Sequence, residues 1–280
     1  MTLPERILSF WNASLGLHEQ VHKTSWGAVV TDSRFPTVHE ANHASVLHAA
    51  PGLTAGDIRS ELFPALAQVG AIDEHIEFMD ADDESPALRE LLTSPGEHDP
   101  DVLMVYEGDG SAISSGVSAE LPEGAEIREV LDPDEAFWEF LRDVPNQYGN
   151  RLPDDVLDQM VNRVQQVFVP AGERFFLGTL NGTDASVTTV LTLEGVAYVN
   201  DVVTWPEFRR RGIASAMVSM AVRASLEGDA DLVFLLAEEG GAAQGLYERL
   251  GFKVWRRCFG FTRLGGTTNL SDELTRGPAL

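Results

Sequence analysis

The stretch NDVVTWPEFRRRGIASAMVSMAV, residues 200–222, limits the fold of this chain more than any other segment. An apolar strand segment, residues 196–204, leads through it into a helix expected from Gly212 to about Glu227. Gly212 and Ala214 leave little side-chain bulk at the helix start, where backbone N–H groups have no partner inside the helix. The segment therefore predicts a strand-to-helix turn that can bind an anion such as a pyrophosphate.

Three consecutive arginines, Arg209, Arg210 and Arg211, precede that helix. They stand out because the chain has 44 acidic and 20 basic side chains and a formal net charge of −24. The plainer interpretation is a solvated charge run before an ordinary helix. The acidic balance of the whole chain argues against a nucleic-acid partner or an anionic membrane surface, since both need a basic face.

Residues 125–264 alternate between strand and helix patterns, which predicts a mixed α/β fold. An Asn181-Gly182 pair between two apolar segments is typical of a hairpin with a tight turn. The expected strands cover residues 125–131, 173–180, 185–193, 196–204, 232–237 and 252–263. The expected helices start at 132–133 and at Pro153, and span 212–227 and 242–250.

Three short motifs in this region resemble the GNAT superfamily of acyl-CoA-dependent N-acetyltransferases. Arg209, Gly212 and Ala214 match the phosphate-loop pattern of that family, and residues 203–208 match its strand end followed by Pro-Glu-aromatic. Residues 246–252, LYERLGF, match its second signature, a helix that ends in Leu-Gly-Phe. The motifs occur in the family's order, and the resemblance covers roughly residues 125–264.

The resemblance implies the GNAT fold, with acetyl-CoA as co-substrate in a cleft between the strands at 196–204 and 232–237. No metal is expected. The pantetheine arm would pair with backbone groups of the first strand, and the pyrophosphate would lie on the turn. The cofactor-binding residues implied in this way are Val202, Val203, Thr204, Arg209, Arg210, Arg211, Gly212, Ile213, Ala214 and Ser215.

Catalysis in the family needs an acid for the departing thiolate, and Tyr247 matches that position. The alternative is that Tyr247 only packs beside Leu246. The base is less clear, because a common glutamate position falls on Asn200, which cannot accept a proton. Asp201 stands beside it, but a bulge in the strand would be needed to turn it inward. The other candidates are Glu238 and its neighbour Glu239, or no dedicated base.

Residues 1–110 repeat the order helix, strand, helix, strand, at 55–69, 75–79, 85–92 and 102–107. This predicts a tandem arrangement in which a degenerate GNAT-like domain, 1–110, is joined by a linker, 111–124, to the acetyltransferase domain, 125–264, with a flexible tail, 265–280. Residues 54–60 lack the glycine spacing of the phosphate loop and carry Asp57 there. The first domain is therefore expected to support the substrate cleft without binding a cofactor.

His39-Glu40-Ala41-Asn42-His43 formally matches H-E-x-x-H, which places two zinc ligands and a glutamate base on one helix face. A zinc-dependent hydrolase is thus an alternative function. The preferred interpretation is a partly exposed polar helix at the border of the substrate cleft, because five-residue matches are common in a His-rich stretch.

The amino terminus lacks a signal-peptide pattern, and there is no apolar run of about 18 residues, so a cytoplasmic location is expected. The single cysteine, Cys258, excludes an internal disulfide framework. The expected function is transfer of an acetyl group to a small-molecule amine, of amino-acid or polyamine-like kind, by a monomer or homodimer. The remaining alternative is a protein that binds acyl-CoA without transferring it.

Overall fold

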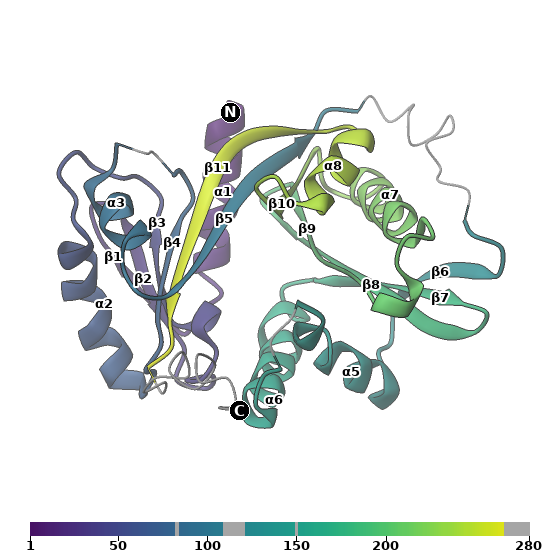
Figure 1. Cartoon of the computed structure of the whole chain (residues 1–280), viewed down its shortest axis with the longest axis horizontal. Coiled ribbons are helices and arrows are strands. Elements are labelled where there is room, and N and C mark those ends of the chain that lie inside the picture. The colour runs from purple at the N-terminus through teal and green to yellow at the C-terminus, as the bar shows by residue number, and fades with distance from the viewer. Residues whose placement is uncertain (82–83, 109–120, 149–150, 266–280) are drawn as a thin grey trace, which may run out of the picture.

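The computed structural model describes residues 1–81, 84–108, 121–148 and 151–265, and their strands form one mixed sheet (Figure 1). The sheet has 11 strands in the order β1-β2-β3-β4-β11-β5-β10-β9-β8-β7-β6. In chain order the strands are β1 (Gln20–Lys23), β2 (Gly27–Thr31), β3 (His43–Val46), β4 (Glu74–Phe78), β5 (Glu97–Tyr106), β6 (Ala125–Val130), β7 (Arg174–Leu180), β8 (Thr183–Leu193), β9 (Val196–Thr204), β10 (Leu232–Glu238) and β11 (Phe252–Arg263).

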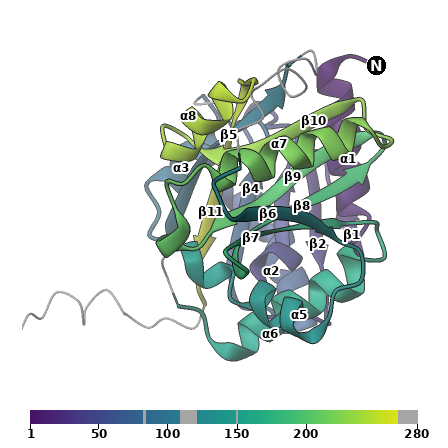
Figure 2. The ribbon, with the colours of Figure 1, turned by 90° about the vertical axis from the view of Figure 1, so that its right-hand side faces the viewer.

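Seven α-helices accompany the sheet in the part of the chain that the structure describes. They are α1 (Leu3–Leu15), α2 (Ala55–Val69), α3 (Pro86–Leu92), α5 (Glu135–Arg142), α6 (Asp154–Arg163), α7 (Ile213–Leu226) and α8 (Ala242–Arg249). In Figure 2 the helix α7 lies on one face of the strands β6 to β9, and α5 and α6 lie on the other face. Within the described residues, no helix is both long and apolar enough to span a bilayer.

The two halves of the chain repeat one motif. The parallel pair β3 and β4 is connected through α2, and the parallel pair β9 and β10 is connected through α7. Each second strand is followed by a short helix, α3 or α8, and then by a long strand, β5 or β11. The repeated order expected from the sequence is therefore confirmed, although β5 begins at Glu97, five residues before the expected start.

The long strands β5 and β11 join the two halves (Figure 1). They pair with each other in antiparallel fashion from Tyr106↔Phe252 to Glu97↔Thr262. Strand β11, from the end of the chain, also pairs with β4 of the first half, whereas β5 pairs with β10 of the second half. Each half thus completes the sheet of the other, and hydrogen bonding runs through the whole sheet without an interruption between the halves.

Apolar side chains on the two faces of the sheet form separate cores, as strand alternation requires. Met104 and Leu235 face α7, while their neighbours Leu103 and Phe234 face α1 on the opposite side. Phe10 of α1 is only 1% exposed, and its ring centre lies 5.0 Å from that of Phe234. A helix from the first half therefore covers strands of the second half.

Most elements of the second half agree with the sequence pattern. The predicted hairpin turn is present, with positive φ angles at Asn181 (51°) and Gly182 (79°). The sequence did not indicate α1 or the strands β1 and β2. Of the expected linker at 111–124, residues 111–120 lie outside the described residues, as do 266–280 of the expected tail.

We predict that Phe10→Ala destabilises both halves together, because Phe10 packs across the junction. Loss of such a buried ring costs roughly 3–5 kcal/mol. Urea denaturation, with hydrogen exchange of the β9 and β10 amides as a local probe, should show one shifted transition that includes the second half. Phe63→Ala is the control, since Phe63 is 42% exposed on α2 and should cost less than about 0.5 kcal/mol. An effect confined to residues 1–108 would contradict the prediction.

Candidate active site

The turn before α7 has the geometry of an open anion site. Gly212 caps the helix with a φ of 83°, in the left-handed region, and a Cβ added there would meet no atom within 4 Å. No side chain caps this helix. The amides of Ile213, Ala214 and Ser215, which start the helix, therefore face an open end that carries partial positive charge.

The three arginines are exposed, but the side chains of Arg209 and Arg211 bond back to the backbone of this loop. The Arg209 side chain folds back, and its Nε donates to the Thr204 carbonyl at 2.8 Å. Arg211 Nη2 donates to the Glu207 carbonyl at 3.2 Å. Arg210 is held at a positive φ of 62°. These contacts hold the loop against the end of β9, so the structure places the predicted residues 202–204 and 209–215 around one turn.

The equivalent helix of the first half has a closed amino terminus. Thr54 caps α2, with its hydroxyl accepting from the Asp57 amide at 3.1 Å and its own amide donating to Asp57 Oδ2 at 2.9 Å. The Ala55 amide donates to Glu90 Oε2 at 3.0 Å. At the start of α2, the carboxylates of Asp57 and Glu90 therefore occupy the position that is open to an anion at the start of α7.

The strands β9 and β10 separate soon after they begin. Their parallel pairing has three pairs, from Leu232↔Val196 to Phe234↔Tyr198, although β9 continues to Thr204 and β10 to Glu238. Beyond Tyr198 the backbone of β9 has no partner on its β10 side among the described strand pairings. This is the separation between strands that the resemblance implied for the pantetheine arm.

Asp201 lies at a bulge in β9. The register with β8 passes from Thr189↔Asn200 to Val187↔Val203, so Asp201 and Val202 together oppose the single residue Thr188. Asp201 has a φ of 46°, a strained conformation that costs about 1–3 kcal/mol and is often retained at functional sites. The bulge that the sequence required for an inward-facing Asp201 is thus present.

Asp201 and Asn200 line a cavity of about 220 Å³ to which both halves of the chain contribute. Its charged lining is Glu40, Arg142, Arg163 and Asp201. The rest is mainly apolar: Val38, Leu141, Val144, Pro145, Met160, Val161, Val164 and Phe168. The residues 164–168 form a π-helical turn that extends α6, a feature common at functional sites.

The carboxyl groups in the cavity, Asp201 and Glu40, and the nearby Glu173 differ in proton affinity. Burial, and next the negative charge of Glu40, raises the pKa of Asp201 to about 6. Burial would also raise the pKa of Glu40, but His39, His75 and Arg163 outweigh it, and the pKa is lowered. Burial, with Asp201 beside it, raises the pKa of Glu173 to about 8. At pH 7 Asp201 is therefore mostly ionised yet close to the pH at which it takes up a proton.

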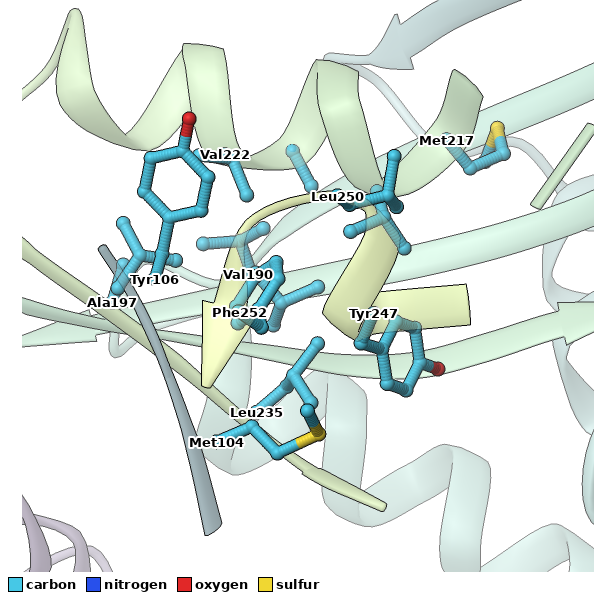
Figure 3. Close-up of a cluster of buried hydrophobic side chains, with 14 of the residues drawn as sticks. Met104, Tyr106, Val190, Ala197, Met217, Val222, Leu235, Tyr247, Leu250 and Phe252 are labelled. Carbon is cyan, nitrogen blue, oxygen red and sulfur yellow. The ribbon is translucent and has the colours of Figure 1, made fainter. Parts of the chain in front are cut away.

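Tyr247 of α8 is buried, with 5% of its surface exposed. Its ring centre lies 6.1 Å from that of Phe252, and Figure 3 shows its hydroxyl at the edge of the cluster, turned away from Phe252 and Leu235. Burial raises the pKa of Tyr247 to about 12, so the hydroxyl retains its proton at neutral pH. It can serve as a donor.

The two glutamates at the end of β10 have different surroundings. Glu238 pairs across the sheet with Asp101 of β5 and is exposed. Burial, together with the charges of Asp99 and Glu238, raises the pKa of Asp101 to about 6. Glu239 forms an ion pair with Arg257 at 2.9 Å. Glu238 thus remains a candidate, while Glu239 already has a cationic partner.

The H-E-x-x-H segment is not a helix face, and the expected polar helix is wrong. His39–Ala41 form one 3₁₀ turn, and His43 begins the buried strand β3. His43 Nε2 lies 3.4 Å from Glu77 Oε2, and His75 Nε2 lies 3.1 Å from Glu77 Oε1. In the described ranges no group of three or more His, Cys, Asp or Glu side chains is placed to hold a metal ion.

Burial lowers the pKa of His43 to about 3. This imidazole is therefore neutral at physiological pH, as part of a buried polar network that also involves His18 and His75. His43 and His75 lie on the sheet face opposite α2, because their strand neighbours Ala44 and Ile76 face the α2 core. The histidine cluster connects β3 to β4 in the structure.

Sequence reasoning missed Arg163, which lines the cavity, and Glu173, which lies close enough to Asp201 and Arg163 to interact with their charges. Arg163 closes α6, and its Nη2 donates to the Glu40 carbonyl at 3.0 Å. A signal for Arg163 existed: a single arginine interrupts the apolar helical spacing of Met160 and Val164, which would bury a charge. Glu173 gives no such signal, because it follows a glycine at the start of a strand.

Comparison with known proteins agrees with this geometry. Residues 171–254 match the family model described as the acetyltransferase (GNAT) domain. No curated protein matches the chain significantly in sequence.

Among solved structures, a functionally unknown conserved protein from Staphylococcus epidermidis has a TM-score of 0.65 at 13% identity, covering 89% of this chain and 94% of its own. A GCN5-related N-acetyltransferase from Kribbella flavida has a TM-score of 0.62 at 17% identity, covering 97% and 99%. A tandem GNAT protein from the clavulanic acid biosynthesis pathway has a TM-score of 0.54 at 14% identity, covering 88% and 82%.

The structural likeness extends over most of the chain, and the family match lies on the strands and helices that surround the open turn. On these findings, the C-terminal half carries a GNAT acetyltransferase domain, and the chain as a whole has the fold of tandem GNAT structures.

Proposed function

We propose that the protein transfers an acetyl group from acetyl-CoA to the amino group of a small-molecule acceptor, by direct attack within a ternary complex. The observation that carries this proposal is the open end of α7 next to the separated strands β9 and β10. The residues 202–204 and 209–215 would hold acetyl-CoA there. When bound, it supplies a thioester carbonyl as acyl donor and a thiolate as leaving group.

The residues around this position can move the two protons that the reaction requires. Asp201, ionised at pH 7 with a pKa of about 6, accepts a proton from the attacking amine. Tyr247, protonated with a pKa of about 12, donates a proton to the departing thiolate. Glu238, at the end of β10, is the second candidate for the base.

The first half of the chain has a supporting role in this proposal. The helix α2 has its amino terminus closed by Asp57 and Glu90, so it offers no place for a pyrophosphate. Residues of the first half instead contribute Val38 and Glu40 to the wall of the cavity. We therefore propose that residues 1–110 are a degenerate GNAT-like domain that shapes the acceptor site of the domain at 125–264.

Gly212→Glu tests the cofactor site. The carboxylate would occupy the place of the pyrophosphate, so we expect acetyl-CoA affinity to fall by at least about 10-fold, from a micromolar dissociation constant that corresponds to about 8 kcal/mol. Calorimetric titration measures it. Gly52→Glu is the matched control, because Gly52 also has a positive φ (88°) and open space around it. Equal binding by both variants would place the cofactor elsewhere.

Tyr247→Phe tests the acid. Loss of a general acid lowers turnover by roughly 100-fold or more. We expect the dissociation constant for acetyl-CoA to change much less. Tyr106→Phe is the control, since Tyr106 is buried in the same cluster and its ring also contacts that of Phe252. A chain that bound acetyl-CoA without releasing CoA in the presence of any amine would instead be an acyl-CoA-binding protein.

Asp201→Asn tests whether Asp201 is the base, through the pH dependence of kcat/KM. Below about pH 6 native Asp201 is protonated and cannot accept a proton, so log kcat/KM should fall more steeply with decreasing pH there. The variant should lose this additional slope and about 100-fold in kcat. Asp101→Asn is the control, because Asp101 also has a pKa of about 6 but does not line the cavity. An unchanged profile in Asp201→Asn would transfer the role to Glu238.

A further inference from the structure

The cavity beside Asp201 contains a guanidinium group that the protein itself does not neutralise by direct contact. Arg163 is largely buried, and both of its hydrogen-bond contacts use Nη2: the Glu40 carbonyl at 3.0 Å and His18 Nε2 at 3.3 Å. Its guanidinium carbon lies 4.8 Å from the ring centre of Phe168. Over the described parts of the chain, no carboxylate lies at ion-pair distance from Arg163. Its remaining N–H groups are therefore available to a ligand.

The other arginine of the cavity shows the contrast. Arg142 Nε donates to Asp158 at 2.6 Å, and its Nη2 donates to Asp154 at 3.0 Å. Two carboxylates on α6 thus neutralise Arg142. A buried guanidinium is expensive to desolvate unless it gains such a partner. Arg163 lacks the partner that Arg142 has, and it lines the same cavity.

The cavity also carries the opposite charge. Asp201 and Glu40 belong to its lining, and Asn200 adds a neutral amide. Arg163 would repel a ligand that carries only positive charge, and Asp201 and Glu40 would repel a ligand that carries only negative charge. A ligand that bears a carboxylate and an amine satisfies both ends, because a guanidinium binds a carboxylate through two parallel hydrogen bonds.

Size and lining restrict the rest of the ligand. A volume of about 220 Å³ is below the ~300–1,000 Å³ of pockets for drug-sized molecules, which indicates a compact acceptor. Eight of the thirteen lining residues are apolar and come mainly from α5, α6 and the turn that follows α6. These residues favour a hydrocarbon side chain over a further charged group.

We propose that the acceptor is a small amino acid with an apolar side chain, whose carboxylate binds Arg163 and whose amino group faces Asp201. This inference rests on the proposed acetyltransferase function. Arg163 is the residue that selects for a carboxylate, and Val38 and Glu40 extend the specificity pocket into the first half of the chain.

The reaction then follows with its atoms in balance. The amine nitrogen forms a bond to the thioester carbonyl carbon, and the carbon–sulfur bond breaks. The ammonium group loses one proton to solvent before the attack and a second proton to Asp201, the coenzyme thiolate takes a proton from Tyr247, and the proton on Asp201 returns to Tyr247 through solvent. The products are an N-acetyl amino acid and CoA. The carboxylate of the acceptor is unchanged and serves only for recognition.

Paired substrates test this assignment in the intact protein. Release of CoA thiol is measured with apolar L-amino acids such as alanine, valine, leucine and methionine, and with the amines that lack only their carboxylate. We expect kcat/KM for the amino acids to exceed that for their paired amines by at least about 30-fold, as the loss of a partner to a buried charge implies. A polyamine such as spermidine should be a poor acceptor.

Arg163→Gln tests whether Arg163 is the residue that recognises the carboxylate. The ratio of kcat/KM between an amino acid and its paired amine should fall by at least about 30-fold, mainly through KM for the amino acid. Arg163→Lys should restore part of the ratio, because it retains the charge but not the paired donors. Arg174→Gln is the matched control: the Arg174 guanidinium carbon also lies over an aromatic ring, 5.4 Å from the ring centre of Phe176, but Arg174 is bonded to Glu129 and does not line the cavity.

The outcomes separate the inference from the function on which it rests. Acetyl-CoA binding by the native protein and by each variant shows that the fold and the cofactor site are intact. If acetyl-CoA binds, and kcat/KM for the paired amines or for spermidine equals that for the amino acids, the carboxylate assignment is wrong while the transferase function stands. An unchanged substrate ratio in Arg163→Gln, or no turnover of any amino acid, also overturns it. Absence of acetyl-CoA binding to the native chain overturns the proposed function itself.

Discussion

The antiparallel ladder between β5 and β11 is the interaction on which the rest of the structure depends. Each half contributes one of these strands to the sheet of the other half. Without this exchange of strands, β4 and β10 would each present a row of unpaired backbone groups inside the molecule, which is costly in a buried sheet. β11 covers β4 and β5 covers β10, so neither half is complete alone. The same exchange sets the distance between the halves, and thereby brings Val38 and Glu40 against the end of β9 to enclose the cavity.

The repeated motif shows how two similar scaffolds acquire different chemistry. Both α2 and α7 follow one strand of a parallel pair, and both begin with unsatisfied amides. In α2, Thr54 and Asp57 satisfy them from within, whereas Gly212 leaves those of α7 open. A few residues at the helix start thus decide between a structural helix and a site for an anion. The sheet itself is the same in both cases.

The sequence predicted the second half well because each of its elements has a local signal. The strand β9, the turn at Asn181-Gly182 and the start of α7 depend on alternation, turn chemistry and glycine, which act within a few residues. The segment around His39 and His43 was predicted wrongly as a polar helix. Asn42 and His43 are buried there, and His43 contacts Glu77 of β4 and the Glu40 carbonyl, so a pattern that relates polarity to exposure fails at these two residues.

The sequence by itself determined the order of elements and the open turn at Gly212, because these follow from residues close together in the chain, and its resemblance to the GNAT family made Tyr247 a candidate acid. Only the tertiary structure decided that Asp201 turns inward, since the bulge depends on the register of β9 against β8. It also decided that Arg163 and Glu40, distant in sequence, share one cavity. The physical reason is that burial and charge pairing act between residues that are close in space. The exchange of β5 and β11 between the halves determines which residues are close.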